Sequence, residues 1–139
     1  MVTSLSFGIR AGILNRLGVQ FNLTASELAT IAGTAFWGFP LAVVIGGFLV
    51  DIIGMKRLLV LAFLLHILGI ILTVFAGGFT SLFISTLCIG LANGTVEAAC
   101  NPLVTALYPD DKTTTLNYFH LWFPGGIVIG TLIVYFMDK

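Results

Sequence analysis

Charged residues are scarce in this chain, and their scarcity excludes most classes of soluble protein. Only 9% of the 139 residues are Asp, Glu, Lys or Arg, against about 25% in an ordinary soluble domain. Hydrophobic residues make up 58% of the chain, and the mean hydropathy is +1.10. The six Lys and Arg residues are scattered and the formal net charge is zero, so the basic patch that nucleic acid requires is missing. The composition predicts an integral membrane protein with no nucleic-acid partner.

Signals for a disulfide, a cleavable leader or a metal site are scarce as well. Cys88 and Cys100 lie inside one hydrophobic stretch and are interpreted as small packing residues. No basic segment precedes the first apolar run, so no signal peptide is predicted. The apolar runs hold no His/Asp/Glu metal set, no paired catalytic aspartates and no Ser/His dyad. These absences argue against an intramembrane enzyme, and no cofactor or metal is predicted.

Long uncharged runs divide the chain into candidate membrane helices. A helix rises 1.5 Å per residue, so about 20 apolar residues cross a bilayer. The run from Leu58 to Val96 has no charged residue and is too long for one crossing, so it must turn at Gly77-Gly78. The sequence therefore predicts an all-α, polytopic membrane helix bundle. Its five expected spans cover residues 1–19, 28–50, 58–76, 79–108 and 113–137.

Local signals refine these spans. Ser26, with Glu27 directly behind it, is predicted to start the second helix. Pro40 and Pro124 fall inside spans and predict kinks that neighbouring helices tolerate. Three helices carry glycines at small-xxx-small spacing, which allows close backbone packing in lipid, with chance in a glycine-rich chain as the alternative. The pairs are Gly8/Gly12, Gly90/Gly94 and Gly126/Gly130.

Three polar residues recur every four positions in the fourth predicted helix. Asn93, Glu97 and Asn101 therefore share one helical face. An acidic residue at mid-bilayer costs about 2.5–3.5 kcal/mol, so Glu97 must face a protein interior or a water-filled cavity. Arg10 in the first helix meets the same difficulty and is predicted to pair with Glu97. An unpaired, desolvated Glu97 could instead exchange a proton near neutral pH.

Donors and acceptors in the spans suit a polyhydroxylated ligand. Carboxylate and amide oxygens accept hydrogen bonds from hydroxyls, whereas amide and guanidinium N–H groups donate to them. The candidate substrate-binding or coupling residues are Arg10, Asn93, Glu97, Asn101, Asn117 and His120.

Aromatic and histidine side chains carry more than one interpretation. Phe119 or Trp122 could stack on the apolar face of a sugar, although Trp37 and Trp122 are more typical of core or interface anchors. His120 is interpreted either as a substrate contact or as a packing residue. His66, alone in an apolar span, is predicted to pack or to face lipid.

The loop after the second predicted helix carries the most specific motif. From Gly47 to Arg57 it reads Gly-Phe-Leu-Val-Asp-Ile-Ile-Gly-Met-Lys-Arg, and it resembles the signature loop of the major facilitator superfamily, G-x-x-x-D-x-x-G-x-K-R. Gly54 permits a tight turn. Asp51 ends a helix, where the macrodipole disfavours an anion, so a compensating partner is expected elsewhere. The resemblance implies a conformational latch, with a plain solvated loop as the alternative; its residues are Gly47, Asp51, Gly54, Lys56 and Arg57.

A second stretch is similar to the fucose permease and glucose/galactose transporter group of that superfamily. Residues 97–102 read Glu-Ala-Ala-Cys-Asn-Pro and residues 116–120 read Leu-Asn-Tyr-Phe-His, where those members carry Glu-Thr-Ala-Ala-Asn-Pro and Leu-Asn-x-x-Gln. The resemblance implies that Glu97 binds sugar hydroxyls or takes part in proton coupling. It makes Asn101 a neighbouring polar contact and His120 the counterpart of a sugar-binding Gln.

Together the two resemblances imply the first five helices of a six-helix N-terminal half. Residues 1–139 would form a partial domain of a secondary transporter that moves a monosaccharide by alternating access, with the missing C-terminal half as its partner. The fucose permease has a second carboxylate in its first helix, where this chain offers only Arg10, so proton symport and facilitated diffusion both stay open. The alternative is a truncated or split, non-transporting membrane protein that acts only through helix–helix assembly.

Basic loop residues indicate an orientation. Lys56, Arg57 and Lys112 follow the second and fourth predicted helices, whereas Arg16 and Lys139 fall on the other side. The positive-inside rule then places the two-three and four-five loops in the cytoplasm. We therefore expect a multi-pass protein of the inner (cytoplasmic) membrane.

Overall fold

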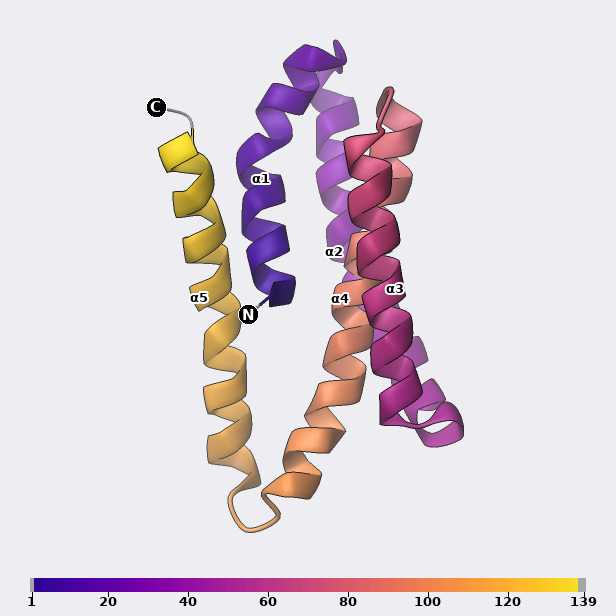
Figure 1. Cartoon of the computed structure of the whole chain (residues 1–139), viewed down its shortest axis with the longest axis vertical. Helices are drawn as coiled ribbons and strands as arrows, with labels where there is room; N and C mark the ends of the chain where they lie inside the picture. The colour runs from indigo at the N-terminus through magenta and orange to yellow at the C-terminus, as the bar shows by residue number, and fades with distance from the viewer. Residues whose placement is uncertain (1, 138–139) are drawn as a thin grey trace.

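The computed structural model describes residues 2–137, and these form five α-helices (Figure 1). They are α1 (Val2–Gln20), α2 (Ala25–Ile53), α3 (Met55–Val74), α4 (Phe79–Leu107) and α5 (Lys112–Met137). Helices α2 to α5 are long and apolar enough to cross a membrane; α1, which carries Arg10 and Arg16, is not among them. The described part of the chain contains no strand. The predicted all-α bundle of membrane helices is confirmed.

The ends of α2 follow local chemistry. Thr24 and Glu27 form a capping box, in which the Thr24 hydroxyl accepts from the Glu27 backbone N–H at 3.3 Å and the Glu27 carboxylate accepts from the Thr24 backbone N–H at 2.8 Å. The predicted start at Ser26 is wrong, because Thr24 has the extended backbone that a cap needs and Ser26 lies inside the helix. At the other end Gly54 has φ 81°, so α2 turns into α3 through one glycine, as predicted.

Helix α4 is the centre of one group of helices, while α1 pairs with α5. In an apolar 18-residue stretch of α4, half of the residues are buried inside the protein. In the corresponding stretches of α2, α3 and α5 the buried share is 17%. Helices α2 and α3 lie along α4, and α1 lies along α5 (Figure 1). The outward faces expose large apolar side chains such as Trp37 and Phe48. Water would penalise such a surface and lipid would not, so the burial pattern fits a membrane bundle.

Glycines bring two pairs of helix backbones into contact. A Cβ added to Gly94 would lie 2.2 Å from the carbonyl oxygen of Phe39, and one added to Gly90 would lie 2.9 Å from another backbone oxygen of α2. A Cβ added to Gly8 would lie 2.4 Å from the carbonyl oxygen of Ile127, which places α1 directly on α5. The close packing predicted from the small-xxx-small spacing is confirmed at these contacts.

The connections alternate between the two ends of the bundle. The α2–α3 and α4–α5 connections lie at one end, and the α1–α2 and α3–α4 connections lie at the other (Figure 1). Lys56, Arg57 and Lys112 are therefore at the same end. That this end faces the cytoplasm stays a prediction.

Candidate functional site

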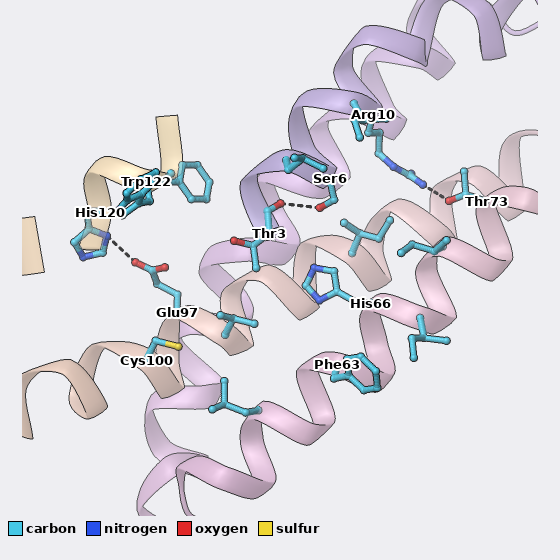
Figure 2. A pocket seen from close by; sticks show the side chains of 18 of the residues that line it. Thr3, Ser6, Arg10, Phe63, His66, Thr73, Glu97, Cys100, His120 and Trp122 are labelled. Atoms are coloured by element: carbon cyan, nitrogen blue, oxygen red, sulfur yellow. Dashed lines mark hydrogen bonds and ion pairs between the residues drawn. The ribbon is translucent and has the colours of Figure 1, made fainter. Parts of the chain in front are cut away.

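A cavity of about 820 Å³ lies between α1, α3, α4 and α5. Its walls are mostly apolar, with a few polar side chains pointing in from all four helices (Figure 2). The polar lining residues include Thr3, Ser6, Arg10, His66, Thr73, Glu97, Cys100 and His120. Small-molecule sites typically measure about 300–1,000 Å³ and combine apolar walls with a few placed polar groups. The cavity is therefore the candidate site.

Glu97 is held by His120 across α4 and α5. The Oε1 atom of Glu97 lies 3.0 Å from Nδ1 of His120 (Figure 2). The Glu97 side chain is 17% exposed and that of His120 is 46% exposed, so the carboxylate is the more buried partner. The His120 ring also meets Phe119 edge-on, with 5.4 Å between ring centroids. As predicted from its cost in lipid, Glu97 faces a cavity.

Arg10 does not pair with Glu97, so the predicted ion pair is wrong. Its guanidinium points away from Glu97, towards Thr73 (Figure 2). It donates to three hydroxyls of α3 and α4. Thr73 and Thr86 each accept from one terminal nitrogen. Ser85 accepts from both, at 3.4 and 3.3 Å.

The three hydroxyls can face the guanidinium as acceptors because their own protons are engaged. Ser85 and Thr86 donate to the carbonyl of Leu82 at 2.9 and 2.7 Å, and Thr73 donates to the carbonyl of Gly69 at 2.7 Å. Each oxygen can then accept from the guanidinium. The N–H groups of the guanidinium thus find neutral oxygen acceptors without Glu97.

His66 is a wall residue of the cavity, contrary to the prediction that it packs or faces lipid. Its Nε2 lies 2.8 Å from Oδ1 of Asn93, and its Nδ1 lies 3.1 Å from the carbonyl oxygen of Ala62. The Asn93 side chain is only 2% exposed, and its Nδ2 has no partner among the described atoms. Asn93 therefore orients His66 and does not itself line the cavity.

Two other predicted site residues lie off the cavity wall. Asn101 is half-buried one turn beyond Glu97, and within the described residues its Oδ1 has no hydrogen-bond partner. Asn117 is exposed on α5. Phe119 and Trp122 both line the cavity, where they could stack on a ligand. Contacts of Asn101 and Asn117 with a substrate stay predictions.

The hydroxyl cluster around the guanidinium is not among the residues predicted from the sequence. A signal for it exists, because Ser85 lies on the same four-residue repeat as Asn93 and Glu97. Ile89 interrupts that repeat, and the polar stripe therefore looks shorter than it is. Thr73, in another helix, gives no comparable signal.

The comparisons with known proteins identify the family. The sequence profile of the Major Facilitator Superfamily matches residues 1–138. The chain belongs to that superfamily. It is similar to solute carrier family 2, facilitated glucose transporter member 10 of Xenopus laevis, at 27% identity over 99% of this chain and 24% of the relative. It is also similar to the D-xylose transporter of Levilactobacillus brevis, at 26% identity over 92% of this chain and 28% of the relative.

A further relative is named for anions. Probable anion transporter 3, chloroplastic, of Arabidopsis thaliana is 30% identical over 84% of this chain and 23% of the relative. The chain spans between about a quarter and a third of the length of the curated relatives that it matches. No solved structure matches it significantly.

The major facilitator signature loop lies at the α2–α3 junction. Asp51 is in the last turn of α2, Lys56 and Arg57 are in the first turn of α3, and all three are exposed. Within the described part of the chain we find no partner for Asp51, so the expected compensating contact is not among these residues. The loop borders a second hollow that α4 reaches through Leu103. Its role as a latch stays a prediction.

Proposed function

We propose that this chain is the N-terminal part of a major facilitator carrier that moves a monosaccharide by alternating access. The observation that carries the proposal is the cavity in which His120 holds Glu97 beside Phe119 and Trp122. A carboxylate and an imidazole suit sugar hydroxyls, and aromatic rings suit the apolar face of a sugar. Relatives named for glucose and D-xylose support this substrate class.

Proton coupling through Glu97 is the finer part of the proposal. The ion pair between Glu97 and His120 requires a protonated imidazole. Histidine is the side chain whose charge changes most readily in the physiological pH range. A sugar and a proton could therefore compete for, or share, the same carboxylate, which favours symport over facilitated diffusion.

The remaining parts of the proposal concern the signature loop and its side of the membrane. Asp51 is exposed at the end of α2, where it is free to meet a helix beyond the described residues. We place this end of the bundle in the cytoplasm, because Lys56, Arg57 and Lys112 lie there together. The inner membrane and a place in the fucose permease-like group belong to the same proposal.

An assembly-only protein is the less favoured alternative. It would need glycine faces that are free to bind a partner helix. Gly8, Gly90 and Gly94 instead touch backbone or side-chain atoms inside the bundle. These glycines are already used by the fold.

The test of the proposed function is Glu97→Gln in the complete carrier, measured by sugar uptake into proteoliposomes under a pH gradient. We expect uptake to be abolished with expression intact, because glutamine cannot carry the charge or the proton. Glu27→Gln is the matched control, since this glutamate is outside the cavity and glutamine also completes a capping box. Uptake at the wild-type rate in Glu97→Gln would rule out the assigned role. A carrier also requires further spans encoded beyond Lys139, and a stop codon there with no partner gene would exclude it.

A further inference from the structure

The charges at one end of the cavity are paired, and the charge at the other end is not. The ionisable residues that line it, among those described, are Arg10, His66, Glu97, Cys100 and His120. Glu97 is engaged by His120 at 3.0 Å. Arg10 is bonded only to hydroxyls, and no described carboxylate pairs with it. The guanidinium therefore leaves a positive charge at its end of the cavity that the bundle does not balance.

Hydroxyl contacts satisfy hydrogen bonding but not charge. A cation removed from water loses solvation that neutral oxygens restore only in part. The two contacts between Arg10 and Ser85, at 3.3 and 3.4 Å, are at the weak end of the hydrogen-bond range. The N–H groups that make them can turn to a stronger acceptor. A carboxylate is such an acceptor, because its pairs with guanidinium are charge-assisted and often bidentate.

We propose that Arg10 forms an anion subsite, so that the preferred substrate is a sugar acid, a monosaccharide that bears a carboxylate. The inference rests on the proposed function, because it names the substrate of the same cavity. The carboxylate binds at Arg10, and the ring hydroxyls extend towards Glu97 and His120 on the other side, past His66 (Figure 2). The reverse orientation is disfavoured, because it would place two carboxylates together at Glu97.

The test compares matched neutral and acidic sugars in binding to the purified complete carrier. Galactose is paired with galacturonate and glucose with glucuronate, because each pair differs only at C6. We expect an acid to bind about tenfold to a hundredfold more tightly than its neutral partner, the range of one charge-assisted contact. If the neutral sugars bind and the acids bind no better, this inference fails and the proposed function stands. If neither class binds, both fail.

Variants of α1 assign the effect to one side chain. Arg10→Gln keeps hydrogen-bond donors but removes the charge, so the ratio of acid to neutral affinity should fall to about one. Arg10→Lys keeps the charge without the planar fork and should retain part of the preference. Arg16→Gln removes the other arginine of α1, which does not line the cavity, and should leave the ratio unchanged. A full acid preference in Arg10→Gln would overturn the assignment; if that variant does not fold, the ratio in Arg10→Lys decides.

Discussion

Gly94→Ala should destabilise the bundle, because the added methyl group has no room between α4 and α2. Its Cβ would lie 2.2 Å from the carbonyl oxygen of Phe39 and 2.8 Å from the Cβ of Ala42. Real Cβ atoms essentially never come within 3.0 Å of such neighbours, so the helices must separate by about 0.8 Å. No side-chain rotation can relieve the clash with Phe39, because the atom met is part of the backbone.

The size of the effect follows from the cost of overpacking. Inserting a methyl group into a packed interface costs about 1–3 kcal/mol, and a backbone clash such as that of Gly94 belongs in the upper half of that range. For a chain of this length, each kcal/mol lowers the melting temperature by roughly 3–5 °C. We therefore expect a fall of roughly 6–15 °C. The assay heats the purified protein in detergent and follows the monodisperse fraction by size-exclusion chromatography.

Gly33→Ala is the matched control for this prediction. A Cβ added to Gly33 meets nothing within 4 Å, and this glycine is also inside a membrane helix, α2. Because alanine is the better helix former, the control should leave the free energy of unfolding unchanged or raise it by up to about 1 kcal/mol. If Gly94→Ala melted at the same temperature as Gly33→Ala, the close contact between α2 and α4 would be refuted.

Two further changes test the cap of α2 and the pair at the cavity. Thr24→Ala should lower the free energy of unfolding by about 1 kcal/mol in the same thermal assay, with Thr24→Ser restoring it; no loss in Thr24→Ala would contradict the capping role. His120→Ala removes the partner of Glu97 and should weaken sugar binding about tenfold or more by titration calorimetry, whereas His120→Gln, which keeps a donor, should lose less. Equal losses in the two variants would show that the charge of His120 matters and not its hydrogen bond.

The helices could be predicted from the sequence because a bilayer leaves the backbone few alternatives. In lipid every backbone polar group must be satisfied internally, so a sufficiently long uncharged run forms a helix. Gly77-Gly78 marks the turn in the longest run, and α3 indeed ends at Val74 before it while α4 begins at Phe79. The sequence does not by itself place the start of α2. Thr24 and Ser26 are both good caps by residue type, and only the extended backbone of Thr24 decides between them.

The partner of Arg10 could not be predicted in the same way. A buried cation is expected to pair with a buried carboxylate, and Glu97 is the acidic residue in the middle of the apolar runs. Serine and threonine give a weaker signal, because in a membrane helix each can bond to a carbonyl of its own helix whichever way it faces. Only the packing of α1 near α3 and α4 gathers Thr73 and Ser85 around the guanidinium.

Because Glu97 contacts His120 and not the predicted partner Arg10, a different chemistry is open to it. A guanidinium stays charged throughout the physiological range, so a pair with Arg10 would have been permanent. The contact with His120, at 3.0 Å between Oε1 and Nδ1, is an ion pair only while the imidazole carries two protons. The cavity then has a cation, Arg10, at one end and a carboxylate–imidazole pair, Glu97 and His120, at the other. A carrier that binds the carboxylate of a sugar at Arg10 leaves the Glu97–His120 pair for the proposed proton coupling, which links the proposed substrate to that coupling.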